Sequence, residues 1–127
     1  MKIPEGHQSI MPYLIVNGAV KFIEFVKQVF DAELTHIVYF DDGKTVMHAQ
    51  VKINGCTIML CDASEKWKQQ TANLFIYVEN ADETYRKSLE CGAVSLMGLS
   101  NQEYGRTCGI TDPFDNVWWI TTANETN

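Results

Sequence analysis

The sequence contains one pattern twice, and this duplication limits the folds that the chain can adopt. Val16-Asn17-Gly18-Ala19 matches Val78-Glu79-Asn80-Ala81, which begins 62 residues further on. The turn sequence Asn54-Gly55 matches Asp115-Asn116 at a spacing of 61 residues. Two independent landmarks at nearly the same spacing indicate a tandem repeat of one structural unit. We therefore expect a single domain of two repeats, at about 9–62 and 71–123, joined by a linker at about 63–70.

Each repeat carries the signals of a strand, a helix and three further strands. Asn17 is predicted to cap the first helix, whose apolar residues recur at helical spacing between Ala19 and Phe30. Asn80 and Glu83 form a capping box that opens the second helix, and Gly92 ends it. Asn-Gly between β-rich runs predicts a hairpin. The expected strands are 10–16, 34–40, 46–53 and 56–62 in the first repeat, and 74–78, 94–99, 106–111 and 117–122 in the second.

This order predicts an α+β fold of two tandem βαβββ modules. In such a module the helix covers one face of the sheet and leaves the other face bare. Two modules can bury their bare faces by turning them toward each other. We therefore expect the two mixed sheets to form a shared cleft, which is the default place for a ligand.

Composition narrows the partners. The 127-residue chain is 46% hydrophobic and 20% charged, which is typical of a globular protein and excludes a disordered one. A net charge of −6 argues against nucleic acid or an anionic membrane as a partner. No apolar run approaches the ~18 residues of a membrane span, and the start lacks a signal-peptide core. We expect a cytoplasmic protein with reduced thiols at Cys56, Cys61, Cys91 and Cys108.

Three segments resemble the vicinal oxygen chelate superfamily. They are residues 14–19 (LIVNGA), residues 48–55 (HAQVKING) with 58–60 (IML), and residues 112–120 (DPFDNVWWI). This superfamily includes glyoxalase I, bleomycin-resistance proteins, fosfomycin-resistance proteins and extradiol dioxygenases. The second and third segments are most similar to its uncharacterised glyoxalase-like or PhnB-like branch. The resemblance implies the glyoxalase/bleomycin-resistance/dioxygenase fold and a homodimer. It does not select one activity, because this scaffold hosts isomerases, oxygenases, transferases and binding proteins.

The resemblance also implies where metal ligands would lie. Metal-using members carry four, usually His, Gln or Glu, on the first and last strands of each half. The matching positions here are Met11, Met59, Asn73 and Trp119. A thioether, a neutral amide and an indole cannot together hold a hard divalent ion. We therefore expect no metal and no cofactor at these positions.

Strand alternation then predicts an aromatic cleft. Residues that alternate with the four matched positions share their face of the sheet. Flat, partly apolar molecules bind such surfaces by stacking and by sulfur–aromatic contacts. The same side chains could instead simply fill the space between the sheets, and both interpretations stay open. The residues that join this face are Tyr13, Ile15, Thr57, Cys61, Phe75, Tyr77, Val117 and Thr121.

His48 is the most suggestive polar residue, because it alternates with Gln50 and Lys52 on one strand. It could act as a base, a hydrogen-bond donor or a relocated metal ligand, or it could be a structural histidine. His7 and His36 have no partner at metal-site spacing and are expected at the surface. Asp62 is expected to hydrogen-bond backbone amides or to line the rim of the cleft.

The loop 100–106 supplies two further candidates. Tyr104 and Arg106 could close over a ligand, and the Arg106 guanidinium suits a carboxylate or a phosphate. No catalytic triad, P-loop or dinucleotide motif is present, so no catalytic residue is assigned. The predicted ligand-binding residues are therefore Met11, Tyr13, His48, Met59, Asn73, Phe75, Tyr104, Arg106 and Trp119.

Three functions fit these observations. The first is metal-independent binding of a small aromatic or amphipathic molecule in the cleft, as in a bleomycin-resistance protein. The second is a glyoxalase-type lyase, isomerase or oxygenase that holds a divalent metal at non-standard positions, His48 among them. The third is an interaction module without a ligand. Whether the protein is an enzyme therefore stays open at this point.

Overall fold

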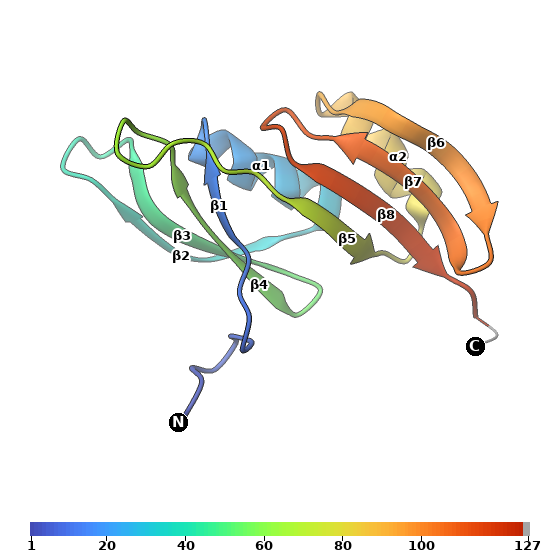
Figure 1. The fold of residues 1–127 in the computed structure, drawn as a ribbon, viewed down its shortest axis with the longest axis horizontal. Coiled ribbons are helices and arrows are strands. Elements are labelled where there is room, and N and C mark those ends of the chain that lie inside the picture. Colours follow the sequence, from blue (N-terminus) through green and yellow to red (C-terminus); the bar gives the residue numbers. More distant parts are fainter. Residues whose placement is uncertain (126–127) are drawn as a thin grey trace. The chain divides into compact units, whose positions relative to one another are not determined.

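A computed structural model describes residues 1–125 and divides the chain into two compact units, Met1–Thr71 and Ala72–Asn127 (Figure 1). Each unit contains a four-stranded sheet and one helix. The predicted α+β class and the βαβββ order are confirmed in both units. Among the described residues, no helix has the length and apolar character that a membrane span requires.

The first unit contains β1 (Tyr13–Val16), α1 (Ala19–Phe30), β2 (Glu33–Tyr39), β3 (Val46–Ile53) and β4 (Cys56–Asp62). Its strand order is β1-β4-β3-β2, and we call it sheet A. Strand β1 runs parallel to β4, whereas β3 pairs antiparallel with both β2 and β4. The sheet is therefore mixed, as predicted.

The second unit repeats this arrangement with β5 (Asn73–Tyr77), α2 (Ala81–Glu90), β6 (Val94–Gln102), β7 (Gly105–Thr111) and β8 (Val117–Ala123). Its sheet, sheet B, has the order β5-β8-β7-β6, with β5 parallel to β8. Relabelling the strands converts one topology into the other. The duplicated sequence therefore folds into two copies of one unit.

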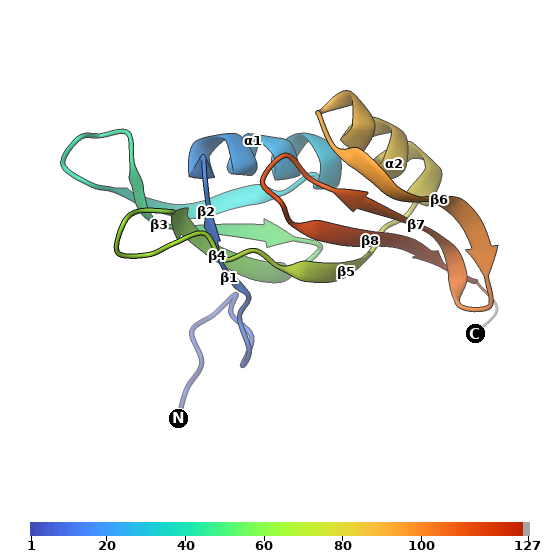
Figure 2. The same cartoon turned by 45° about the horizontal axis from the view of Figure 1, so that its top comes forward.

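Each helix packs against one face of its own sheet (Figure 2). In the first unit, α1 contributes large apolar side chains, including the buried Phe22 and Val26. In the second unit, α2 is mostly polar and buries only Ala81, Thr84 and Ser88. Sheet B compensates for these small residues with Trp118, which is 1% exposed. The bulk of the second core therefore comes from the sheet.

The start of α1 corrects the expectation that Asn17 caps it. The N-cap residue is Gly18 at φ 97, and it offers no side-chain hydrogen bond. The side chain of Asn17 donates to Gln69 instead. Asp62 at the end of β4 takes over the capping role, because its Oδ1 accepts from the backbone N–H of Ala19 at 2.8 Å. Its Oδ2 accepts from the N–H of Val46 at 2.8 Å, which agrees with the expectation that Asp62 binds backbone amides.

The capping signals of α2 are confirmed. The side chain of Asn80 accepts from the N–H of Glu83 at 3.1 Å. At the other end, Gly92 has φ 100, and the N–H groups of Gly92 and Ala93 bond to the carbonyls of Leu89 and Ser88. This pair of bonds is the Schellman motif. Sequence signals alone therefore fix both ends of this helix.

The last turn of each unit is built differently. In the first unit, Asn54 and Gly55 have φ 48 and 82, as the hairpin signal predicts. In the second unit, the carboxylate of Asp112 is 3% exposed and accepts from the backbone N–H groups of Phe114 and Asn116. It also accepts from the side chains of Asn116 and Trp118. One buried carboxylate therefore organises the whole β7–β8 turn.

Candidate functional site

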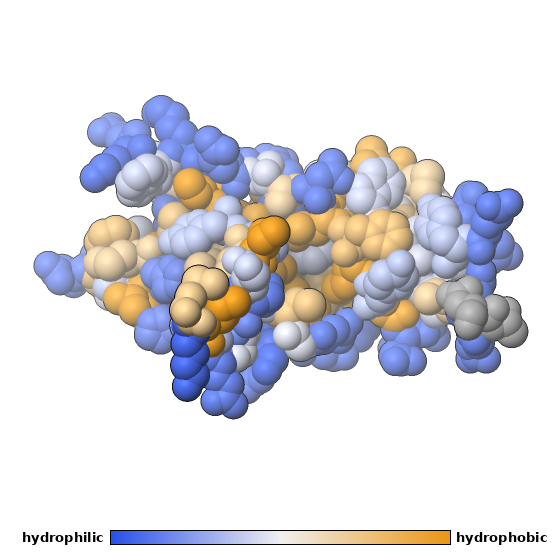
Figure 3. Space-filling view, turned by 60° about the horizontal axis from the view of Figure 1, so that its bottom comes forward, coloured by the Kyte–Doolittle hydropathy of each residue, from blue (hydrophilic) through white to orange (hydrophobic). Residues whose placement is uncertain are grey.

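Each sheet has one face turned away from its helix, which we call the helix-free face. Alternation puts Leu14 and Leu60 against α1 and leaves Tyr13 and Met59, which are register partners, on the helix-free face of sheet A. In sheet B the side chain of Trp118 is buried on the helix side, so the residues next to it along β8 point to the helix-free face. Figure 3 shows orange and pale residues exposed among hydrophilic blue ones on the side of the structure that it displays. The predicted site residues Asn73, Phe75 and Trp119 lie on the helix-free face of sheet B, with Phe75 and Trp119 in register.

Exposed aromatic rings gather on the second unit. Phe75, Tyr77 and Tyr104 are 50%, 59% and 50% exposed. The ring of Phe75 lies 5.3 Å from that of Tyr77 in an edge-to-face arrangement and 6.2 Å from that of Tyr104. These separations fall within the range of favourable ring contacts. Phe75 therefore links Tyr77 and Tyr104 into one aromatic surface.

Trp119 lies beside Phe75 in the sheet and is held in place on two sides. Its indole N–H donates to Oδ1 of Asn73 at 2.5 Å. On the neighbouring strand, Gly109 is the register partner of Trp119. A Cβ atom at Gly109 would lie 2.5 Å from Cζ3 of the indole, so the ring occupies the space that a side chain would need. The absent side chain of Gly109 and the amide of Asn73 together fix the orientation of the ring.

The charge of the chain is concentrated in this unit. Residues 72–127 contain eight acidic and three basic side chains, a net charge of −5, whereas residues 1–71 contain eight and seven, a net charge of −1. Two of the three cations are paired, Arg86 with Glu90 and Arg106 with Asp82. The aromatic surface therefore belongs to a strongly acidic unit, which attracts cations.

The helix-free face of sheet A carries a chain of hydrogen bonds instead. Nε2 of His7 lies 3.0 Å from Oε1 of Gln50, and Nε2 of Gln50 lies 3.0 Å from Nε2 of His48. The other ring nitrogen of His48 lies 3.0 Å from the hydroxyl of Tyr13. Tyr13 in turn hydrogen-bonds the thiol of Cys61. Both nitrogens of His48 are therefore occupied, which favours the structural interpretation of this residue.

These hydrogen bonds and the burial of the groups determine the protonation states of His48, Tyr13 and Cys61. Burial lowers the pKa of His48 below its usual value, and electrostatic interaction with His36 and His7 lowers it further. A neutral His48 that accepts from the amide of Gln50 must carry its proton on Nδ1 and donate it to Tyr13. Burial is also the main reason that the pKa values of Tyr13 and Cys61 are raised. All three groups are therefore uncharged near neutral pH.

An N-terminal strap, residues 6–11, lies on the same side of sheet A (Figure 2). The hydroxyl of Thr57 donates to the carbonyl of Gly6 at 2.6 Å. The side-chain amide of Gln8 donates to the carbonyl of Thr57 at 2.7 Å and accepts from its N–H at 3.3 Å. Because β1 begins opposite Met59, the backbone of Thr57 lies beyond the start of that strand. Gln8 takes the place that a neighbouring strand would fill.

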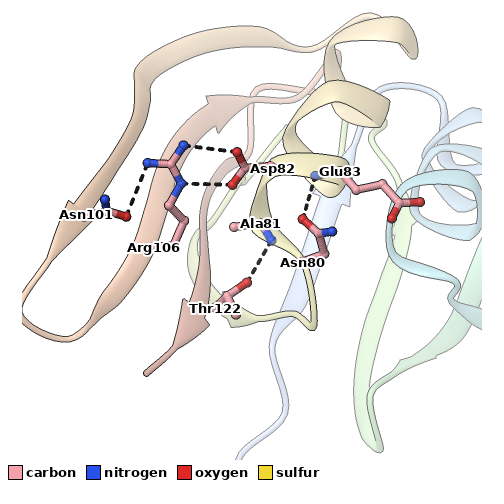
Figure 4. Close-up of polar contacts among 7 residues, drawn as sticks. All are labelled: Asn80, Ala81, Asp82, Glu83, Asn101, Arg106 and Thr122. Atoms are coloured by element: carbon pink, nitrogen blue, oxygen red, sulfur yellow. Dashed lines mark hydrogen bonds and ion pairs between the residues drawn. The ribbon is translucent and has the colours of Figure 1, made fainter. Parts of the chain in front are cut away.

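Two predicted residues lie elsewhere than expected. His7, expected at the surface, is half-buried and bonded to Gln50, because the strap carries it onto the sheet. Arg106 points to the helix side of sheet B, where its Nε and Nη2 donate to the two carboxylate oxygens of Asp82 at 2.9 and 3.0 Å (Figure 4). Its Nη1 donates to Asn101. Arg106 therefore fastens β7 to the first turn of α2.

Comparison with known proteins decides the family. The family model of the Glyoxalase/Bleomycin resistance protein/Dioxygenase superfamily matches residues 8–120. The chain belongs to this superfamily. The uncharacterized protein Mb0911c of Mycobacterium bovis is 30% identical over 122 residues, which cover 87% of this chain and 80% of that protein.

Solved structures of the superfamily share the fold. The putative 3-demethylubiquinone-9 3-methyltransferase, PhnB protein, from Bacillus cereus has a TM-score of 0.72 at 22% identity, covering 91% of this chain and 100% of that one. TnmS3, an antibiotic binding protein from Streptomyces sp. CB03234, has a TM-score of 0.70 at 18% identity, covering 93% and 100%. The resemblance to the superfamily is confirmed by the family model, and the likeness to the PhnB protein shows a shared fold.

The four positions that match the superfamily's metal ligands divide between the two units. Met11 lies in the strap, where its sulfur accepts from the N–H of Gln8, and Met59 lies on β4. Asn73 and Trp119 bond to each other. Within residues 1–125, no group of three or more His, Cys, Asp or Glu side chains is arranged to hold a metal ion. Two thioethers, a neutral amide and an indole at these four positions do not fit a hard divalent cation.

Sequence reasoning missed the partners of His48. His36 is the register partner of Gln50 on β2, and its ring lies 6.1 Å from that of His48. The turn at Asp42 and Gly43 predicts the β2–β3 hairpin, so its register could have brought His36 to this face. No pattern could have placed His7 there, because the strap has no regular secondary structure.

Proposed function

We propose that this superfamily member binds a small planar aromatic molecule on the helix-free face of sheet B without using a metal ion. The observation that supports this function is the seating of Trp119. Its indole lies over Gly109 and is fixed by Asn73, while neighbouring rings at Phe75 and Tyr104 are half exposed. A ring held in this way loses little conformational entropy when a ligand stacks on it.

The physical chemistry favours a stacked ligand. Each aromatic contact contributes about 0.5–1.5 kcal/mol beyond the burial of its area, so three or four rings contribute about 1.5–6 kcal/mol of the ~8 kcal/mol that micromolar binding needs, and buried apolar area has to supply the rest. The net charge of −5 on this unit favours a cationic ligand over an anionic one. The name of TnmS3, an antibiotic binding protein, supports small-molecule binding on this fold. This proposal is the binding function predicted from the sequence, now assigned to one surface.

The test is calorimetric titration with 9-aminoacridine, a planar aromatic cation, and with 9-anthracenecarboxylate, a planar anion of similar size. We expect micromolar binding of the cation and at least about tenfold weaker binding of the anion. Trp119→Ala is expected to weaken the cation's binding at least about tenfold, because the platform is lost. Trp67→Ala is the matched control, since Trp67 is 56% exposed and lies in the first unit.

Two results would contradict the proposal. One is a failure of both probes, and of a wider panel of planar aromatic cations, to bind more tightly than about 1 mM. The other is an equal loss of affinity in Trp119→Ala and Trp67→Ala, which would indicate nonspecific adsorption to exposed rings. Far-UV circular dichroism of each variant shows whether its fold is retained.

A further inference from the structure

We propose that His7, Gln50 and His48 form a proton-operated latch, which holds the N-terminal strap on sheet A while His48 is neutral and loosens it when both histidines are protonated. This device is independent of the aromatic surface, because all its parts lie in the first unit. It follows from the hydrogen-bonding capacity of one amide group.

The side chain of Gln50 lies between two imidazoles. A primary amide has a donating nitrogen and an accepting oxygen, so it can give a hydrogen to one imidazole and accept one from the other. Here its oxygen faces His7 and its nitrogen faces His48, each at 3.0 Å. His7 must therefore carry a proton on Nε2, and His48 must not.

Protonation affects the two histidines differently. A protonated His7 still presents Nε2–H to the oxygen of Gln50, so its bond persists. A protonated His48 presents Nε2–H to the donating nitrogen of Gln50, and two donors then face each other. If the amide of Gln50 rotates to relieve this contact, its nitrogen meets the N–H of His7 instead. Either way, Gln50 keeps only one of its two hydrogen bonds to His7 and His48 when both imidazoles are charged.

Charged and titratable groups from every neighbouring segment take part in this balance. His36 on β2 and His7 on the strap oppose the charging of His48 through their own positive charge. Tyr13 occupies the second nitrogen of His48. These groups come from the strap, β1, β2 and β4, and they are His7, Tyr13, His36 and Cys61, while Lys52 lies further along the same face of β3.

Acid therefore loosens the strap. The pKa of His48 is lower in the folded chain than in the unfolded one, so the folded contact is complete above the usual histidine pKa. It is lost as the pH falls through the lowered value. Within residues 1–125, the other side-chain hydrogen bonds between the strap and sheet A, at Gly6 and Gln8, are made to Thr57. Losing the His7 bond thus leaves the strap held at one residue of the sheet.

The state of the latch can be measured directly from the hydrogen exchange of two backbone amides in β4. The N–H of Thr57 bonds to the side chain of Gln8 in the strap, whereas the N–H of Met59 bonds to the carbonyl of Pro12, outside the strap. Between about pH 7.5 and pH 5, we expect the protection factor of Thr57 to fall about tenfold, the worth of one hydrogen bond. That of Met59 is expected to stay constant after correction for the intrinsic exchange rate.

Two variants make the test decisive. Gln50→Glu places acceptor oxygens opposite both imidazoles, so acid should hold the strap more firmly and the trend at Thr57 should reverse. His48→Gln removes the titration, and the protection of Thr57 should no longer depend on pH. Lys52→Gln is the control on the same face, with the wild-type response expected. The protection of Met59 shows in each case that the sheet is folded.

The latch is refuted if the protection of Thr57 in the wild type does not change with pH. It is also refuted if Gln50→Glu shows the same acid loss as the wild type, because the amide would then have no part in it. Should His48→Gln lose protection at Met59 and thus prove unfolded, Gln50→Glu and the wild type decide the question.

Discussion

The two units of the chain have the same topology but use their helix-free faces in opposite ways. In the first unit this face is covered in part by the chain's own strap and bonded through His7, Gln50 and His48. In the second unit it presents aromatic rings, with Phe75 and Tyr77 at least half exposed. On this face, the first copy of the repeat pairs its polar side chains with one another, whereas the second copy leaves aromatic rings exposed to solvent.

The difference extends to charge and to the ends of the helices. The second unit carries −5 of the net charge of −6. Both helices begin with an N–H that bonds to the last strand of the sheet, Ala19 to Asp62 and Ala81 to Thr122, each at 2.8 Å. The scaffold contacts are thus retained in kind, while the helix-free faces have diverged. The two copies have therefore kept the contacts that join helix to sheet, while the residues available for binding on their helix-free faces have changed.

The largest expected effect concerns the last turn of each unit. Asp112→Ala is expected to lower the free energy of unfolding by about 3 kcal/mol, because four hydrogen bonds to a buried carboxylate are lost. Asn54→Ala in the equivalent turn should cost only about 1 kcal/mol, the strain of a left-handed alanine. Urea unfolding measures both. Equal losses would show that the two turns are energetically alike despite their different construction.

A smaller effect is expected at the seat of Trp119. Gly109→Ala places a Cβ 2.5 Å from the indole, which must move and release Asn73. We expect a loss of about 1–2 kcal/mol in stability and about tenfold in affinity for 9-aminoacridine. Gly98→Ala is the matched control, since nothing lies within 4 Å of that site.

The outcome separates two roles for the glycine. If Gly109→Ala binds the probe as the wild type does, the orientation of Trp119 does not matter and the aromatic surface acts only through its area. If both alanine variants lose affinity equally, the effect arises from the strands and not from the indole. A change in the fluorescence of Trp119 in Gly109→Ala alone reports the displacement of its ring.

Local signals in the sequence predicted the fold well because they act over few residues. The bounds of β3 and β4 follow from the alternation around Asn54-Gly55, and both ends of α2 follow from Asn80 and Gly92. The cap of α1 failed for the opposite reason. Asp62 reaches Ala19 across 43 positions of the chain, and Asn17 is a good capping residue that the φ of Gly18 leaves unused.

The candidate site residues show the same difference between local signals and contacts with residues far away in the sequence. Alternation predicted that Tyr13, Phe75 and Trp119 would face away from the helices, because strand periodicity depends only on neighbouring residues. The place of His7 depends on an irregular strap, and that of Arg106 on its pairing with Asp82, 24 positions earlier. Contacts of this kind need tertiary structure and leave no periodic trace in the sequence.

The smallest expected effect concerns Arg106, which was predicted to bind a ligand. Its guanidinium lies on the helix side of sheet B and is bound by Asp82 through two hydrogen bonds (Figure 4). Arg106→Gln should therefore change the affinity for 9-aminoacridine no more than Lys87→Gln, which removes the same charge from the same unit. Calorimetry at two salt concentrations checks this, because a purely electrostatic effect of either variant is screened by salt.

The ion pair itself should contribute a small, salt-sensitive stabilisation. The guanidinium of Arg106 holds the pKa of Asp82 below its usual value, so this contribution is complete above the ordinary Asp pKa and disappears as the pH falls through the lowered one. Arg106→Gln and Asp82→Asn should each remove it. A loss of affinity in Arg106→Gln that Lys87→Gln and Asp82→Asn do not share would restore Arg106 to the binding surface. Both faces of sheet B would then contribute to ligand binding. The contrast between a helix side that only stabilises the fold and a helix-free face that binds the ligand would then fail in this unit.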